Sequence, residues 1–178
     1  EWENMPEDIN LAHPAFANNG LRLFFVSDME KGKGESDIYY SDFTEGKWNT
    51  PVNLGDNINS EFTEVFPEVS GDTLLYFSSD GYPGYGNLDI YKVKINGDSF
   101  GKAQNLKAPI NSIGNDFSFY HIDKYNGYFT SNRSESSIGM NDLYKFSYPE
   151  PVVEEPEEEE PEEEPYVHEF NPDEFNPM

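Results

Sequence analysis

Three aspartates, Asp37, Asp89 and Asp142, recur at one position in three similar segments of the chain and are its clearest candidates for chemistry. Carboxylates can act as catalytic acids or bind calcium. However, an aspartate needed in every segment more often holds a turn together, because it accepts hydrogen bonds from turn N–H groups. The sequence also contains no D-x-[DN]-x-[DN]-G calcium loop. We therefore interpret these aspartates as structural and leave only adventitious calcium binding open.

Two other patterns bear on catalysis and metal binding. Residues 97–101 match the G-x-S-x-G motif of nucleophile elbows, which requires a strand before it and a helix after it. This segment instead aligns with residues 46–49, so it is interpreted as a hairpin turn. His13, His121 and His168 have no partner at a metal-ligand spacing. We therefore predict no catalytic residue, no cofactor and no metal site, and a protein that is not an enzyme.

The segments that hold these residues form a repeat of about 52 residues. A Phe-x-Ser motif recurs at a spacing of 52, and an Asp-Ile-Tyr or Asp-Leu-Tyr motif recurs at spacings of 52 and then 53. Chance does not explain so many identities in register. The repeated structural positions are Asp37, Asp89, Asp142, Tyr39, Tyr91, Tyr144, Ser27, Ser79 and Ser131.

Each unit is predicted to contain four short strands separated by turns. The second strand is rich in aromatic residues, as a buried strand requires, and the third alternates apolar and charged side chains with period two. A short fourth strand carries Trp48 or Phe100. The first strands are predicted at 14–17 and 67–70, the second at 21–26, 73–78 and 127–130, and the third begin at the repeated aspartates. Four-stranded units of this length are typical of β-propeller blades.

The predicted fold class is therefore all-β, with about three four-stranded blades that form a partial propeller, followed by an extended acidic tail. Propellers close with ~4–8 blades, whereas residues 1–148 hold fewer than three units. We expect either that the sequence is part of a longer chain or that another chain completes the ring. The first alternative is favoured, because residues 1–6 look like the end of a preceding unit.

Charge divides the chain into two parts. Of 178 residues, 35 are acidic and 11 basic, a net charge of −24, and there is no cysteine, which excludes disulfides and thiol chemistry. Residues 149–178 carry 13 of the acids, 7 of the 13 prolines and no lysine or arginine. This predicts a folded domain at 1–148 and an acidic Pro/Glu-rich linker or docking tail at 149–178. Sparse basic residues argue against a nucleic-acid or anionic-membrane partner, and no apolar run approaches the ~20 residues of a membrane-spanning segment.

The tail contains two similar aromatic motifs. Blocks of glutamate alternate with prolines, which favours an extended path, and Glu-Phe-Asn-Pro then occurs twice, with its rings at Phe170 and Phe175. One interpretation is a solvated spacer to a further domain, which composition favours. The other is that Phe170 and Phe175 dock on a partner while the glutamates face a basic surface.

The blade phrases resemble a known family of repeats. Residues 12–16, 23–28, 75–81, 86–91 and 128–133 resemble the WD40-like, TolB-type propeller repeat. Their order is similar to that of OmpA-family propeller proteins of Bacteroidota, including components associated with the type IX secretion system. The resemblance covers roughly residues 1–147. It implies a periplasmic protein associated with the outer membrane, with a peptidoglycan-binding OmpA-like domain that these 178 residues do not contain.

From these observations we expect a non-enzymatic envelope scaffold whose propeller binds other cell-envelope proteins, namely outer-membrane complex subunits. Peptidoglycan binding would come only through a domain outside this sequence. Two alternatives stay open. One is a carbohydrate-active or peptidase-associated propeller, and the other is a TolB-like module that recruits a peptidoglycan-associated lipoprotein.

Overall fold

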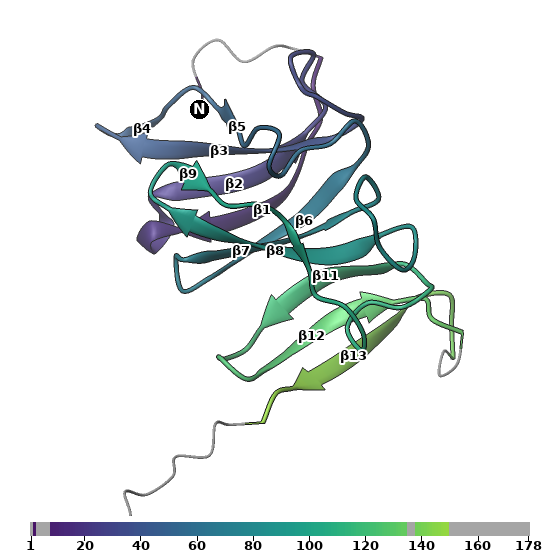
Figure 1. Ribbon diagram of the computed structural model, residues 1–178. Coiled ribbons are helices and arrows are strands. Elements are labelled where there is room, and N and C mark those ends of the chain that lie inside the picture. Colours follow the sequence, from purple (N-terminus) through teal and green to yellow (C-terminus); the bar gives the residue numbers. More distant parts are fainter. Residues whose placement is uncertain (1, 3–7, 135–137, 150–178) are drawn as a thin grey trace, which may run out of the picture.

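The computed structural model describes residues 2, 8–134 and 138–149, and within this part of the chain the fold is all-β, with three antiparallel sheets (Figure 1). The first two sheets have five strands each and the third has three. A single 3₁₀ turn, η1 (Asn18–Gly20), joins the first two strands. The sheets lie one beside the next in chain order, and the described sheets do not close into a ring.

The three sheets repeat one strand order. The first sheet contains β1 (Leu11–Ala17), β2 (Arg22–Ser27), β3 (Asp37–Thr44), β4 (Lys47–Trp48) and β5 (Val52–Asn53). The second contains β6 (Glu64–Ser70), β7 (Leu74–Ser79), β8 (Asp89–Asn96), β9 (Ser99–Phe100) and β10 (Gln104–Asn105). The third contains β11 (Asp116–His121), β12 (Asn126–Ser131) and β13 (Asp142–Ser147). In each sheet the second strand lies between the first and the third.

The register of the central strand pairs is the same in every sheet. Phe25 lies opposite Tyr39 on β2 and β3, and their rings are 6.0 Å apart. The equivalent pairs are Phe77 with Tyr91, at 5.8 Å, and Phe129 with Tyr144, at 5.6 Å. Because cross-strand aromatic pairs stabilise a sheet, the repeated Phe and Tyr fix this register.

Two apolar cores fill the spaces between the sheets. Phe24, Ile38, Leu75 and Phe77 lie fully buried between the first and second sheets. A second, more aromatic core lies between the second and third sheets and includes Tyr76, Ile90, Phe119, Phe129 and Phe146. Each interior sheet face is therefore covered by the neighbouring sheet rather than by a helix.

The first strand of each sheet contains a β-bulge. The bulges lie at residues 13–14, 66–67 and 118–119. His13, Phe66 and Ser118, the first residue of each bulge, have positive φ angles of 49°, 54° and 56°. We call β1, β6 and β11 the innermost strands, because the first strand of each sheet contacts the first strand of the next. A bulge adds one residue and bends the strand, so these three strands share one bend at the same position. These strands contact one another in that order.

The predicted strand boundaries agree with the structure in part. The third strands begin at Asp37, Asp89 and Asp142, as predicted. The first strands begin three residues before the predicted starts at residues 14 and 67, because the bulge lets the strand continue past a proline. The short strands β5 and β10 were not predicted. The tail boundary, Phe170 and Phe175 concern residues 150–178, which lie outside the described residues.

Candidate functional site

The three repeated aspartates bind the loop that precedes their strand. The Asp89 carboxylate accepts hydrogen bonds from the main-chain N–H groups of Tyr85, at 2.6 Å, and Gly86, at 3.4 Å. Asp37 accepts equivalent bonds from Lys33 and Gly34, and Asp142 from Ile138 and Gly139. Burial raises the pKa of Asp89. The three carboxylates lie in separate sheets and each binds its own loop, while Oδ1 of Asp89 is buried without a hydrogen-bond partner among the described residues.

The repeated serines have different surroundings in each sheet. Ser79 donates a hydrogen bond of 2.6 Å to Glu64, and Ser131 accepts one of 3.0 Å from the Arg133 side chain. The hydroxyl of buried Ser27 has no hydrogen-bond partner among the described residues. This difference parallels the residue that begins the first strand of each sheet. A buried acid begins β6 (Glu64) and β11 (Asp116), whereas a leucine begins β1.

Two buried asparagines carry a structural role that the sequence analysis missed. The Asn59 side chain accepts a hydrogen bond from the Ile38 N–H and donates one to the Ile38 carbonyl, both at 2.9 Å. Asn111 makes the same pair of bonds with Ile90. Each amide thus satisfies a strand's edge as another strand would. The recurrence of Ile-Asn-Ser at 58–60 and 110–112 was the available signal.

Two glycines allow the chain to cross from one sheet to the next. A Cβ atom at Gly34 would collide with the carbonyl oxygen of Phe62, and one at Gly86 with that of Gly114. At these crossings the Glu64 N–H donates to the Ser36 carbonyl, and the Asp116 N–H donates to the Leu88 carbonyl. The innermost strand of each later sheet is therefore tied to the third-strand loop of the sheet before it.

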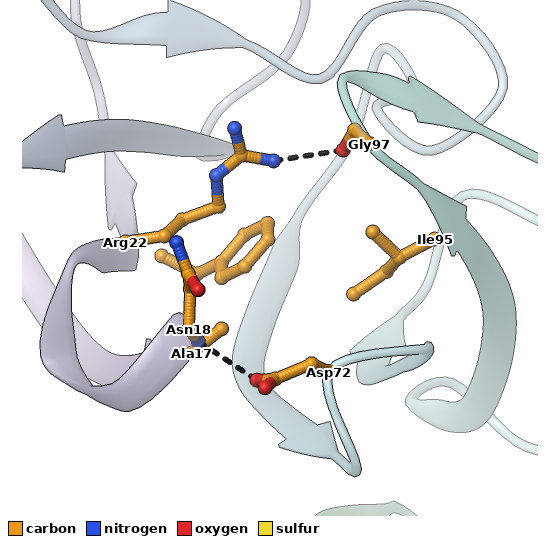
Figure 2. A pocket seen from close by; sticks show the side chains of 7 residues that line it. Ala17, Asn18, Arg22, Asp72, Ile95 and Gly97 are labelled. Carbon is orange, nitrogen blue, oxygen red and sulfur yellow. Dashed lines mark hydrogen bonds between the residues drawn. The ribbon is translucent and has the colours of Figure 1, made fainter.

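A cavity of about 240 Å³ lies between the ends of the first and second sheets, beside Arg22 (Figure 2). Arg22 forms two hydrogen bonds with Asp42, one with Asp98 and one with the Gly97 carbonyl, and its guanidinium lies 4.3 Å from the centre of the Tyr40 ring. Figure 2 shows the bond to Gly97 across the cavity. Because the Arg22 guanidinium is already bound by two carboxylates, Arg22 links the first and second sheets rather than serving as a ligand-binding group.

A second hollow, of about 200 Å³, lies where the three innermost strands meet. We call it the inner-strand hollow; its lining residues are His13, Pro14, Phe66, Pro67, Glu68, Ser118, Phe119 and Tyr120. His13 and Phe66 have ring centres 4.1 Å apart, and Phe117 continues the stack 5.3 Å from Phe66. One aromatic ring from each sheet therefore lies along this line, and the bulges bring them to the same level.

Polar groups in the inner-strand hollow are few. His13 Nδ1 accepts a hydrogen bond of 3.4 Å from the Phe66 N–H, and burial lowers the pKa of His13. Glu68 is half-buried; burial raises the pKa of its carboxyl, and the main-chain N–H of His121 partly offsets this shift. Tyr120 is 57% exposed at the margin. The hollow thus combines aromatic walls with one acidic group.

The third sheet has an outward face made of Phe117, Tyr120, Tyr128, Thr130, Leu143 and Lys145, which alternate with residues of the second core. The residues at the same repeat positions in the first and second sheets are buried or half-buried. Ile38 and Ile90 are 0% exposed, whereas Leu143, at the same repeat position, is 69% exposed. The lower edge of Figure 1 shows β12 and β13 with no described sheet beyond them.

The other residues that the sequence offered as candidates for catalysis or metal binding lie apart from one another. Residues 97–101 span the turn between β8 and β9, β9 itself and the residue after it, with Gly97 at a φ of 61°, and the next element is the strand β10 rather than a helix. His13 and His121 lie in β1 and β11. Within residues 2, 8–134 and 138–149, no group of three or more His, Asp or Glu side chains is placed to hold a metal ion.

Comparison with known proteins gave no match, either to a protein-family model or to a curated protein. In the part of the chain that the structure describes, no helix is long and apolar enough to cross a membrane. The fold and the inner-strand hollow are therefore the features that bear on function.

Proposed function

We propose that the three sheets are consecutive blades of a β-propeller. Three features support this proposal: the sheets share one strand order, each contains the same bulge in its first strand, and β1, β6 and β11 lie beside one another. In a propeller the first strand of each blade lies nearest the central axis, and the faces of neighbouring blades pack together. The exposed Leu143 on the outward face supports a further sheet beyond the third.

We propose further that this propeller is a non-enzymatic scaffold that binds other cell-envelope proteins. The observation that carries this proposal is the inner-strand hollow, which three sheets build jointly from aromatic residues and which is open at its margin. Concave, aromatic-rich surfaces with few polar groups are typical of binding sites. The repeated aspartates, by contrast, are occupied by their own loops.

The resemblance of the repeat to the OmpA-family propeller proteins supplies the cellular setting of the proposal. In that setting the protein is periplasmic, is associated with the outer membrane, and reaches peptidoglycan through an OmpA-like domain outside this sequence. The acidic residues 149–178 would connect the propeller to that domain or dock on a partner.

Cross-linking in the cell that makes the protein tests this function. The tagged protein is cross-linked, isolated from the solubilised outer-membrane fraction, and its attached proteins are identified. We expect a reproducible set of envelope proteins, and recovery of the protein alone would contradict the proposal.

A pair of tyrosine variants shows whether the hollow is the contact. Tyr120 lies at the margin of the hollow, whereas Tyr85 lies elsewhere and is similarly exposed, at 57% and 50%. Tyr120→Ser should reduce the cross-linked yield of at least one partner, and Tyr85→Ser should leave it unchanged. Equal losses from both variants would place the contact outside the hollow.

A further inference from the structure

The inner-strand hollow is lined by an acidic side chain but by no cationic one. Glu68 is the only charged carboxylate among its lining residues, and these include no lysine or arginine. Among the described residues, the ion pairs involve Asp42, Asp98, Asp56 and Asp116 but not Glu68. Half-burying a carboxylate without a cation is unfavourable, and burial accordingly raises the pKa of Glu68.

The walls around Glu68 suit a flat cation. Both faces of the Phe66 ring are covered, by His13 and by Phe117, whereas the Tyr120 ring at the margin is exposed and can receive a cation. A guanidinium can stack on an aromatic face and at the same time form two parallel hydrogen bonds with a carboxylate. A lysine ammonium can make the ion pair but lacks the planar, two-pronged geometry.

We infer that the inner-strand hollow binds an arginine side chain presented by a partner protein, with Glu68 as its ion-pair acceptor and the exposed Tyr120 ring as its stacking surface. This inference rests on the proposed function in that it takes the hollow as the place where a partner enters. The strongly acidic character of the chain, with a net charge of −24, favours a basic partner segment over an acidic one.

The inference fits the structural roles of the neighbouring groups. The main-chain N–H of His121 favours the ionised form of Glu68 and leaves the carboxylate acceptor capacity for a guanidinium. Glu68 lies opposite Tyr76 in the β6–β7 register, so its strand is held by sheet pairing and by the second core. The main chain that carries Glu68 is therefore held in place before the ligand arrives, which lowers the entropic cost of binding.

Nuclear magnetic resonance on the full chain tests the inference with three capped tripeptides, acetyl-Gly-Arg-Gly-amide and its Lys and Gln counterparts. The arginine peptide should cause saturable shifts at Ser118 and Tyr120 and should bind at least about tenfold more tightly than the glutamine peptide. Lysine should lie between them. Equal binding of the arginine and glutamine peptides, or no saturable shift up to about 10 mM peptide, would overturn the inference.

Two charge-removing variants locate the site. Glu68→Gln should weaken binding of the arginine peptide at least about tenfold, whereas Glu45→Gln, in the exposed β3–β4 turn, should leave it within about twofold. Equal weakening by both variants would indicate non-specific attraction and contradict the inference. If Glu68→Gln does not fold, the pH dependence of the wild-type protein decides, because affinity must fall as Glu68 takes up a proton.

Peptide binding and co-isolation separate this inference from the proposed function. If envelope proteins are cross-linked normally to the Glu68→Gln protein and no arginine peptide binds the wild type, the scaffold function stands and the arginine inference fails. If the arginine peptide binds through Glu68 but no envelope protein is recovered, the inference stands and the proposed scaffold function fails.

Discussion

The side-chain amide of Asn111 forms two hydrogen bonds with the main chain of Ile90, accepting from its N–H at 2.8 Å and donating to its carbonyl at 2.9 Å. Asn59 repeats this arrangement on Ile38 one sheet earlier. Asn111 and Ile90 are 21 residues apart, so the amide ties the end of the inter-sheet connection to the edge of β8. A buried side-chain amide therefore adds to the apolar core and the main-chain bonds that hold neighbouring sheets together.

Asn111→Ala should destabilise the protein by about 2 kcal/mol, because it leaves the buried N–H of Ile90 without a partner, while the Ile90 carbonyl keeps its hydrogen bond from the Leu106 N–H. Urea unfolding followed by tryptophan fluorescence measures this loss. Asn87→Ala, at an exposed loop position, is the matched control and should change the free energy of unfolding by less than about 0.5 kcal/mol. Similar losses in both variants would show that the amide of Asn111 has no special role.

Gly86→Ala should destabilise the packing of the third sheet on the second by about 3 kcal/mol or more. The new Cβ atom would collide with the Gly114 carbonyl oxygen, a main-chain atom that cannot move without displacing the crossing. Gly101→Ala serves as the control, because its Cβ would meet only ordinary contacts at 3.7 Å and beyond. We expect the control to change stability by at most about 0.5 kcal/mol in calorimetric unfolding, and an unchanged melting temperature for Gly86→Ala would contradict the crossing geometry.

Equivalent apolar residues should differ in their contribution to stability according to whether a sheet covers them. Ile90→Ala should cost about 3 kcal/mol, since Ile90 is fully buried between the second and third sheets. Leu143→Ala, at the same repeat position on the outward face, should cost less than about 0.5 kcal/mol in this chain. Chemical denaturation of both variants checks the contrast. A loss of several kcal/mol for Leu143→Ala would mean that the outward face is already covered.

Protonation of His121 should weaken the contact between the second and third sheets. Burial lowers its pKa, and its ring lies among Tyr76, Phe119 and Phe146, at 4.6, 4.8 and 5.6 Å. The unfolded chain therefore binds the proton more readily than the folded one, with an unfolded pKa of about 6.5. The stabilising effect of the neutral ring is complete above that pH and is lost as the pH falls below it.

The comparison of wild type with His121→Gln isolates this effect, because the buried carboxyls of Glu64 and Glu68 titrate in both proteins. Stability measured between pH 5 and pH 8 should fall less steeply below about pH 6.5 in the variant than in the wild type. Parallel curves over this range would show that His121 does not contribute. Asp123, whose charge raises the pKa of His121, is present in both proteins and cancels in the difference.

Much of the strand pattern followed from the sequence because its causes are local. The repeated Asp-Ile-Tyr motif predicted where β3, β8 and β13 begin, and the structure confirms these starts. The starts of the first strands were wrong, since Pro14 and Pro67 were interpreted as strand beginnings. Both prolines lie instead within bulges, where a missing N–H disrupts no ladder.

The candidate site was less accessible from the sequence. The half-buried Glu68 is one acid among 35, and nothing in its neighbours along the chain distinguishes it. Its environment comes from β1 and β11, which lie some fifty residues away on either side. The role of Asn59 and Asn111 was likewise hidden, although their Ile-Asn-Ser motif was visible as a repeat.

The sequence by itself determined the repeat, the all-β class and the order of the main strands, because side-chain alternation, turn residues and cross-strand pairs act over a few residues. Only the tertiary structure decided which groups meet at the inner-strand hollow and which sheet face remains outward. Those properties depend on how neighbouring sheets stack, and stacking is set by contacts between residues about fifty positions apart. The same aliphatic position is therefore core at Ile38 and Ile90 but surface at Leu143.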